Sequence, residues 1–286
     1  MYKILGQGVG GVVVADSANV VKKFYFFQSD GVSEQQQLTF LGSLQDQGFD
    51  IGCTIPRLLE VVGEGKWKVD DKTYAYCNRM ERVPGTCARL AVPTFTEREI
   101  EILGKDLGTA AFNLHTLSKA YMEQWQRTFG EGDRLLAHIL GDKAAQVMRE
   151  EPDQSVRTRI KDAAAYLENQ CRSQASENTL CHVDFSLSNT QASDTGHVNG
   201  LVDWGGFGIT NPSLSLYQMA ARSVWPHLKR QYKQMGGSIR EDIVYAAASI
   251  HLAWAPIICK QLNLPLEPEE TRDRLEVMYA QFEAHV

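Results

Sequence analysis

The chain lacks the features that mark a secreted protein, a protein with a structural zinc site or a membrane-spanning protein. Its six cysteines are scattered without a Cys-x-x-Cys pair, which argues against a structural zinc site and a disulfide framework. It has no apolar run of the roughly 18 residues that would span a bilayer, and no apolar leader. The net charge of −6 argues against a basic face for nucleic acid. We therefore expect a cytoplasmic protein with reduced thiols that binds neither membrane nor nucleic acid.

The composition that remains is that of a globular chain. Hydrophobic residues make up 43% and charged residues 22% of 286 positions, enough for one large domain or two lobes. Strand-like segments dominate the first eighty or so residues, around one helix predicted over residues 33–44, and helical periodicity dominates after Val83-Pro84-Gly85. We therefore expect an α+β fold, with a small β-rich lobe over residues 1–83 and a larger helical lobe over residues 84–286.

A glycine-rich segment lies between the first two predicted strands. It fits the pattern G-x-G-x-x-G-x-V, with glycines at Gly6, Gly8 and Gly11 and the valine at Val13. A Rossmann-type loop needs a helix directly afterwards, whereas strand residues follow here. One interpretation is a plain hairpin turn in which glycine allows a positive φ. The other is a hairpin folded over the phosphates of a nucleotide, which is the kinase arrangement.

Two lysines follow in the strand Val20-Val21-Lys22-Lys23. A lysine on an apolar strand is costly unless an anion meets it. Aligned on the V-A-I-K pattern of kinases, Lys22 would hold the α- and β-phosphates and Val20 would touch the adenine. We prefer Lys22 for this role and expect Lys23 to be exposed, although the register leaves both open. Glu34 in the predicted helix is the natural ion-pair partner.

The strongest signal is the segment His-Val-Asp-Phe-Ser-Leu-Ser-Asn at residues 182–189, which matches H-x-D-[LF]-x-x-x-N. Asp203 stands fourteen residues after Asn189, at the end of an apolar segment that predicts a buried strand. Asp184 can orient the proton of an attacking hydroxyl. Asn189 and Asp203 offer the hard oxygen ligands that hold Mg²⁺ against a triphosphate.

Together these motifs resemble the aminoglycoside phosphotransferase and choline kinase-like family, relatives of the protein kinases, over nearly the whole chain. Residues 107–115 are similar to the family's helix ending in Leu-His, and Asp203-Trp204 is followed by Asn211-Pro212, similar to the family's Asp-Trp and Asp-Pro. The Ala-Pro-Glu motif of protein kinases does not occur. Three positions depart from the family: Val183 stands in place of a glycine, and Asn211 and Ser215 stand in place of aspartates.

The resemblance implies a bilobal protein-kinase-like fold and transfer of the γ-phosphate of ATP to a hydroxyl group. Asp184 would be catalytic, and Asn189 and Asp203 would bind Mg²⁺. The adenine would lie between the lobes, hydrogen-bonded to the connector backbone, with Met80 at the back of its pocket. The nucleotide-binding residues that the resemblance implies are Gly6, Gly8, Gly11, Val13, Val20, Lys22, Glu34, Met80, Glu81 and Val83.

The phosphate acceptor is the least readable feature. Residues 84–286 carry 25 acidic against 20 basic side chains, which favours a cationic small molecule such as an aminoglycoside-like or other amine-bearing antibiotic. A solvated acidic surface explains the same count. The alternatives are a kinase for choline, homoserine or a sugar, an atypical protein kinase, and a non-catalytic nucleotide-binding module. The sequence indicates neither the oligomeric state nor a preference for ATP over GTP.

Overall fold

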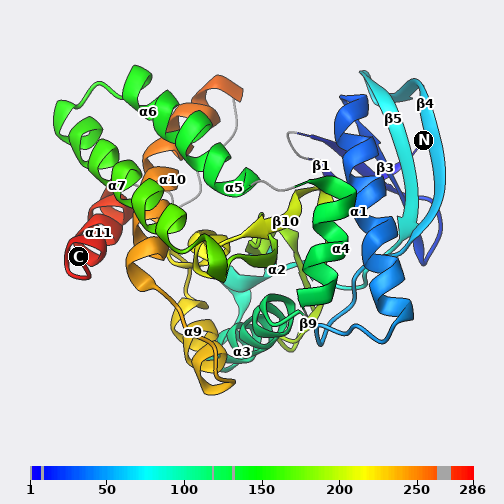
Figure 1. Ribbon diagram of the computed structural model, residues 1–286. Coiled ribbons are helices and arrows are strands. Elements are labelled where there is room, and N and C mark those ends of the chain that lie inside the picture. Colours follow the sequence, from blue (N-terminus) through cyan, green and yellow to red (C-terminus); the bar gives the residue numbers. More distant parts are fainter. Residues whose placement is uncertain (1, 8–9, 118, 131–132, 263–271) are drawn as a thin grey trace. The chain divides into compact units, whose positions relative to one another are not determined.

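The computed structural model describes residues 2–7, 10–117, 119–130, 133–262 and 272–286 (Figure 1). The chain forms two compact units. The first unit comprises residues 1–103 and 187–207, and the second comprises residues 104–186 and 208–286. Each unit is described by itself. The lobe boundary expected between residues 83 and 84 stays a prediction.

The first unit is built on an antiparallel sheet that has five strands among the described residues, in the order β1-β2-β3-β5-β4. Its strands are β1 (Lys3–Gln7), β2 (Gly11–Ala15), β3 (Val20–Tyr25), β4 (Leu58–Val69) and β5 (Lys72–Glu81). Helix α1 (Gln28–Asp46) joins β3 to β4 and runs along this sheet, as Figure 1 shows. The helix predicted over residues 33–44 is therefore confirmed and is longer at both ends.

The strand register assigns each side chain to one face of this sheet. Residues that pair directly across an antiparallel ladder share a face, and neighbours along a strand alternate. Lys22 pairs with Val14 and Arg79, which places these three side chains on one face. Lys23 pairs with Val13 and Asn78 on the other face. The two adjacent lysines therefore serve opposite sides of the sheet.

Helix α1 approaches the face that carries Lys23 at Gly31. A Cβ atom at this glycine would lie 2.3 Å from the ring of Tyr76 and 3.0 Å from that of Tyr25. Asn78 Nδ2 also donates a hydrogen bond to Gly31 O at 2.9 Å. The missing side chain thus lets the helix lie directly on β3 and β5, one turn before Glu34.

The rest of the first unit is a small antiparallel sheet with short helical segments. Its strand order is β6-β8-β9. Strands β8 and β9 pair as a hairpin, and β6, about a hundred residues earlier in the chain, pairs with β8. The elements are β6 (Thr86–Cys87), α2 (Ala88–Ala91), η1 (Val92–Thr94), η4 (Leu187–Asn189), β8 (Thr190–Ala192), β9 (Val198–Leu201) and η5 (Trp204–Gly206). Helix α3 (Glu97–His115) begins in this unit and ends in the second.

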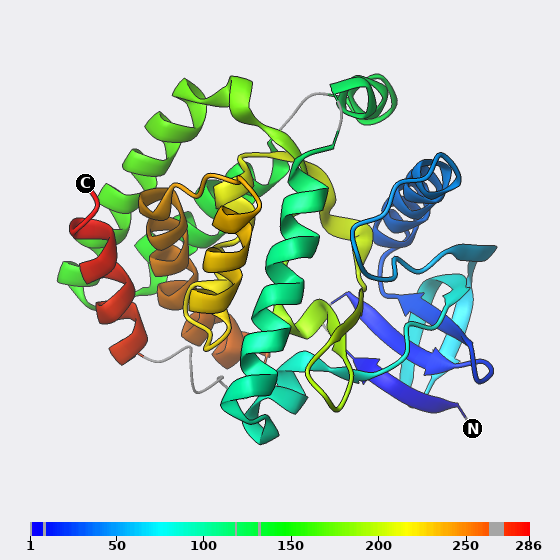
Figure 2. The ribbon, with the colours of Figure 1, turned by 90° about the horizontal axis from the view of Figure 1, so that it is seen from below.

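The second unit is mostly helical. Its long helix α10 (Glu241–Leu262) packs against α7 (Gln154–Ser173) and α11 (Arg272–Glu283), which Figure 2 shows beside it. The other helical segments are α4 (Lys119–Phe129), α5 (Arg134–Ala137), η2 (His138–Ala144), α6 (Ala145–Glu150), η3 (Ala175–Glu177), α8 (Pro212–Ser215), η6 (Tyr217–Met219) and α9 (Trp225–Gln234). Strands β7 (Thr179–His182) and β10 (Phe207–Thr210) pair with each other.

Helix α10 corrects one expectation. By length and composition its stretch Glu241–Gln261 is apolar enough to cross a membrane, although no such run was expected from the sequence. In the structure, 67% of the most apolar window is buried inside the protein. The helix therefore has the surroundings of a core helix, whose apolar residues pack against its neighbours.

We expect opposite effects from alanine at two glycines of α1. Gly31→Ala should lower the free energy of unfolding by roughly 1–3 kcal/mol, because the added methyl group overlaps Tyr76. Gly42→Ala should raise it by up to about 1 kcal/mol, since a Cβ there meets nothing within 4 Å and alanine favours the helix. Urea denaturation of both variants measures this difference. Equal changes in the two would contradict the close approach at Gly31.

Candidate functional site

A cluster of charged side chains lies on the face of the sheet that carries Lys23, which we call the inner face. Lys23 Nζ lies 2.7 Å from Glu34 Oε2 and 2.7 Å from Asp203 Oδ1. Side-chain exposure is 12% for Lys23 and 3% for Glu34, whereas Asp203 is 47% exposed. Strand β3, helix α1 and the turn after β9 thus bring one cation and two carboxylates together, all within the first unit.

The electrostatics of this cluster keep the lysine charged. Burial alone would lower the pKa of Lys23, but the charges of Glu34 and Asp203 outweigh it and raise the pKa. Burial raises the pKa of Glu34, and the ammonium group of Lys23 opposes that shift. We take the pair as ionised, because two charge-assisted contacts of 2.7 Å favour the charged forms.

Two further residues hold the carboxylate of Glu34 in place. Tyr25 Oη donates to Glu34 Oε2 at 2.8 Å, and Asn78 Nδ2 donates to Tyr25 Oη at 3.3 Å. The sequence analysis missed both residues. Tyr25 could have been predicted, because residues two apart on a strand share a face and Tyr25 lies two residues after Lys23. Asn78 could not, because its place opposite Lys23 follows only from the pairing of β3 with β5.

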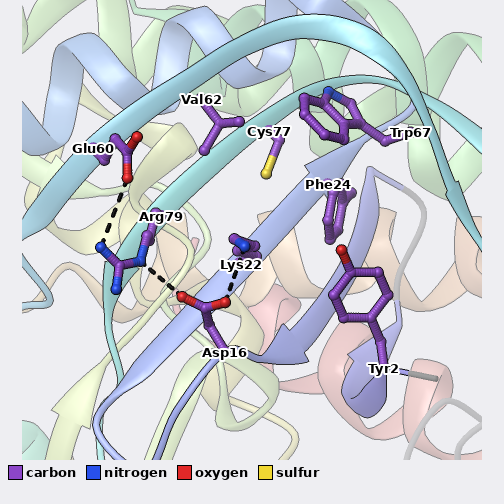
Figure 3. A pocket seen from close by; sticks show the side chains of 9 residues that line it. All are labelled: Tyr2, Asp16, Lys22, Phe24, Glu60, Val62, Trp67, Cys77 and Arg79. Atoms are coloured by element: carbon purple, nitrogen blue, oxygen red, sulfur yellow. Dashed lines mark hydrogen bonds and ion pairs between the residues drawn. The ribbon is translucent and has the colours of Figure 1, made fainter.

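The expected pairing of Lys22 with Glu34 is wrong, and so is the expected exposure of Lys23. Lys22 Nζ pairs with Asp16 at 2.9 Å on the outer face of the sheet, as Figure 3 shows, while Lys23 contacts Glu34 and Asp203. Val20 was aligned in the same register and shares the face of Lys22. A shift of one residue along a strand moves every side chain to the opposite face. The structure thus does not bring Lys22 and Asp203 together.

The corrected register places a consistent set of apolar residues on the inner face. Val21 pairs with Met80 across β3 and β5, and both side chains are buried. Val13 pairs with Lys23 across β2 and β3. Val13 and Met80 therefore share the face of Lys23, where a residue that contacts the nucleotide would have to lie. Val21, and not Val20, lies on this face.

The glycine-rich segment joins β1 to β2 as a hairpin. Gly6 pairs with Val13, and a Cβ atom at Gly11 would lie 2.0 Å from Phe24 O. Gly11 is therefore required by the close packing of β2 on β3, whereas a Cβ at Gly6 would meet nothing within 4 Å. Gly8 lies outside the described residues.

The connector residues after β5 are held by backbone contacts. Glu81 N donates to Arg57 O at 2.9 Å, and Arg57 N donates to Glu81 Oε2 at 3.1 Å. Val83 is buried, and a Cβ atom added at Gly200 would lie 2.7 Å from its side chain. The contacts of adenine with Glu81 and Val83 stay a prediction.

Asn189 and Asp203 lie at the same end of the hairpin formed by β8 and β9. Thr190 pairs with Leu201, and beyond this pair Val202 N donates to Asn189 O at 2.9 Å. Asp203 then turns into the left-handed region, with φ 63° and ψ 58°, a conformation that aspartate adopts more readily than most residues. The hairpin therefore presents an amide and a carboxylate at one edge, the first buried and the second partly exposed.

This pair of oxygen donors fits Mg²⁺ only in company with phosphate. Mg²⁺ in proteins is usually held by one or two carboxylates plus water and substrate phosphate oxygens. In the described part of the chain, no group of three or more His, Cys, Asp or Glu side chains could hold a metal. The chemistry of Asn189 and Asp203 therefore suits an ion that arrives with a nucleotide.

Asp184 belongs to the second unit. Gln218 Nε2 donates a hydrogen bond to its Oδ1, and burial together with the charge of Asp184 raises the pKa of the neighbouring Tyr217. Lys143 Nζ donates to Tyr217 Oη at 2.7 Å and lies 4.8 Å from the ring centroid of Trp254. No sequence motif singled out Gln218 or Lys143, because they come from elements far apart in the chain.

His115 and Ser215 explain one departure from the family pattern. Ser215 Oγ donates to Pro212 O at 2.8 Å, so it accepts from His115 Nε2 at 3.1 Å. Tyr232 Oη then donates to His115 Nδ1 at 3.0 Å. The network satisfies a neutral imidazole, and burial lowers the pKa of His115 to about 3. With serine in place of aspartate, the histidine carries no charge at neutral pH.

The fold is that of a kinase-like phosphotransferase. Residues 15–247 match the family described as the phosphotransferase enzyme family, APH. The chain therefore belongs to this family and is a kinase, which confirms the resemblance, the fold class and the enzyme class expected from the sequence. A search of curated proteins found no match.

Solved structures of aminoglycoside phosphotransferases share the fold at low sequence identity. The GDP complex of a point mutant of aminoglycoside 2'-phosphotransferase-IIIa is 12% identical, with a TM-score of 0.71 over 99% of this chain and 92% of that one. The GDP and kanamycin complex of APH(2'')-IIIa is 12% identical, with a TM-score of 0.66 over 100% and 94%. The streptomycin-ATP complex of APH(2'')-IIa is 15% identical, with a TM-score of 0.57 over 99% and 93%.

We expect the two adjacent lysines to differ sharply in activity assays. Lys23→Met should lower kcat/KM for the nucleotide roughly 100- to 1,000-fold, the range for removing one positioned cationic donor. Lys22→Met should leave it nearly unchanged, since its partner Asp16 lies on the other face and a partly exposed ion pair contributes little. Circular dichroism checks folding, and the double variant Lys23→Met/Glu34→Gln removes the unpaired carboxylate. Equal losses for Lys22 and Lys23 would refute the corrected register.

The buried histidine should make stability depend on pH. The unfolded chain binds a proton at His115 below pH 6.5, whereas the folded chain resists it until about pH 3. Stability should therefore fall as the pH drops through this window, by up to about 1.4 kcal/mol per pH unit. His115→Gln should remove this part of the slope in urea denaturation series.

Ser215→Asp is the matched variant for this prediction. A carboxylate near Nε2 should raise the pKa of His115 and flatten the same part of the slope. If both variants keep the wild-type pH dependence, His115 is not the group responsible.

Proposed function

We propose that this kinase transfers the γ-phosphate of ATP to a hydroxyl group of a small molecule. Lys23, held by Glu34, binds the α- and β-phosphates, and the β1–β2 hairpin covers them. Asp184 orients the acceptor hydroxyl, with Gln218 fixing its carboxylate. The observation that carries this proposal is the convergence of Lys23, Glu34 and Asp203 at 2.7 Å within one unit.

Asn189 and Asp203 would hold Mg²⁺ together with the phosphates. The bound ion would neutralise charge that develops on the transferred phosphoryl group. Asp203 would then exchange its contact with Lys23 for the ion, and Lys23 would turn from Asp203 to phosphate oxygens while keeping Glu34. The side-chain exposures support these two roles: Glu34 is buried and can stay on Lys23, whereas Asp203 is partly exposed and can reach an ion.

We propose an aminoglycoside-like or other amine-bearing antibiotic as the acceptor, which implies a role in antibiotic resistance. The support is the family match and the fold shared with phosphotransferases solved with kanamycin, gentamicin or streptomycin. The excess of acidic side chains over residues 84–286 suits a cationic acceptor. The cytoplasm as location is part of this proposal and is supported by six free cysteines.

A kinase for a choline-, homoserine- or sugar-type metabolite is the second candidate, and one observation favours it. Lys143 places a positive charge beside Tyr217. Burial and the charge of Asp184 both raise the pKa of Tyr217, so Tyr217 lies in the field of both charges. A cation beside Tyr217 repels a positively charged acceptor, a polyamine and choline alike, so this observation favours only the neutral, sugar-type acceptor of this group.

We expect Asp184→Ala to abolish turnover and leave ATP binding nearly intact, because Asp184 acts on the acceptor and not on the nucleotide. A coupled ATP-consumption assay measures turnover, and isothermal titration measures nucleotide binding. Gln218→Ala is the matched variant, with a smaller loss of kcat. Wild-type turnover in Asp184→Ala would refute the assignment.

The acceptor itself is tested by the same coupled assay against a panel. The panel contains aminoglycosides, cyclic-peptide antibiotics, choline, homoserine, sugars and a generic protein substrate. Turnover with aminoglycosides alone supports the first candidate, and turnover with choline, homoserine or a sugar supports the second. Tight ATP binding without turnover on any acceptor would refute both and indicate a non-catalytic nucleotide-binding protein.

A further inference from the structure

Helix α1 carries three consecutive glutamines directly after Glu34, and their surroundings differ. Gln36 is exposed, whereas the next residue, Gln37, is only 1% exposed. Glutamine is seldom buried this deeply, because a buried amide side chain is costly unless both its donor and its acceptor are used. The partners of Gln37 therefore show what this side chain does.

Both ends of the Gln37 amide have a partner. Phe207 N donates to its Oε1 at 3.2 Å, and its Nε2 donates to Ser33 Oγ at 3.2 Å on the same helix. The orientation of the amide follows from the chemistry, because a backbone N–H can only donate and so has to face the oxygen. Phe207 N also donates to Trp204 O, which closes the short helix η5. Gln37 thus contacts the backbone where η5 ends.

The turn that Gln37 contacts is the one that begins with Asp203, the residue before η5. At the start of this turn, Lys23 Nζ lies 2.7 Å from both Asp203 and Glu34. In the middle, a Cβ atom added at Gly205 would lie 3.4 Å from Glu34 Cβ. At the end, Gln37 accepts from the backbone, one helical turn after Glu34. Helix α1 therefore holds the turn at its start, its middle and its end, all within the first unit.

The contacts at the two ends of the turn respond differently to a nucleotide. In the proposed function, Asp203 exchanges Lys23 for a Mg²⁺ ion, so the contact at the start of the turn is given up. The hydrogen bond from Phe207 N to Gln37 involves neither Lys23 nor a carboxylate, and it is therefore kept. It is also buried, and hydrogen bonds are stronger in such surroundings than in water.

We propose that Gln37 is a positioning residue that holds Asp203 in place for Mg²⁺ after Asp203 has left Lys23. This inference rests on the function proposed above. Gln37 acts through the backbone, because it fixes Phe207 against α1 and only the three residues of η5 separate Phe207 from Asp203. Glu34 lies on the same helix. The lysine that binds the phosphates and the carboxylate that binds the ion are thus aligned against one element.

The test compares ADP binding with and without Mg²⁺ in the wild type and in Gln37→Met. Methionine has nearly the length of glutamine, favours the helix and removes both hydrogen bonds. Isothermal titration gives the Kd for ADP in excess EDTA and in excess Mg²⁺, and the ratio of the two measures the contribution of the ion. We expect Gln37→Met to lower this ratio roughly three- to tenfold, the equivalent of one lost hydrogen bond. The Kd in EDTA should stay within about twofold of the wild type.

Two further variants separate positioning from a purely structural role. Gln36→Met makes the same change at the adjacent exposed position and should keep the wild-type ratio. Ser33→Ala removes only the group that accepts from Nε2 of Gln37, so it should lower the ratio less than Gln37→Met does. Urea denaturation without ligand measures the stability of each variant. A purely structural role would lower stability there and leave the ratio unchanged.

An unchanged ratio in Gln37→Met, or an equal fall in Gln36→Met, overturns the proposal. If Gln37→Met does not fold, an unchanged ratio in Ser33→Ala overturns it instead. These results leave the proposed phosphotransfer standing, because they concern the variants alone. A wild-type protein that binds ADP no more tightly with Mg²⁺ than without it would contradict the proposed role of Asp203, and this inference would fall with it.

Discussion

The ion pairs of Lys23 are the interaction on which the proposed catalytic arrangement depends. An ammonium group that is only 12% exposed is stable in its charged form because two carboxylates contact it at 2.7 Å. Each carboxylate comes from a different element, one from helix α1 and one from the turn after β9. The cluster therefore joins three elements of the first unit that are distant in the chain. In the proposed mechanism, the phosphates of a nucleotide replace the partly exposed carboxylate of Asp203 in this cluster.

The backbone supports this cluster at two points. Gly31 lets α1 lie on β3 and β5, which brings Glu34 within reach of Lys23 and Tyr25. The hairpin of β8 and β9 aligns Asn189 with the residue before Asp203, and the left-handed backbone at Asp203 ends that strand. The functional groups thus depend on close approach and strand register more than on their own neighbours in sequence.

Much of this could be predicted from the sequence, and the misses have physical causes. The α+β organisation and the glycine hairpin follow from periodicity and motif order, and the kinase pattern indicates Glu34 as the partner of a lysine on β3, although it favours the wrong lysine. The choice between Lys22 and Lys23 could not be settled, because both orientations of a strand are equivalent until a neighbouring strand fixes the register. Asn78, Gln218 and Lys143 contact their partners over long sequence separations, so no local pattern marks them.

The adjacent lysines of β3 also bear on how this strand tolerates changes in length. Inserting one residue between Val20 and Lys22 would either exchange the faces of the side chains before the insertion or slip the pairing of the residues after it, which would move Phe24 out of its aromatic cluster with Tyr2 and Trp67. The slipped pairing would still present an ammonium group to Glu34, because Lys22 would take the place of Lys23. The pair of adjacent lysines therefore keeps a positive charge at the inner face when the strand register shifts by one residue. The apolar residues of the outer face have no adjacent substitute of this kind.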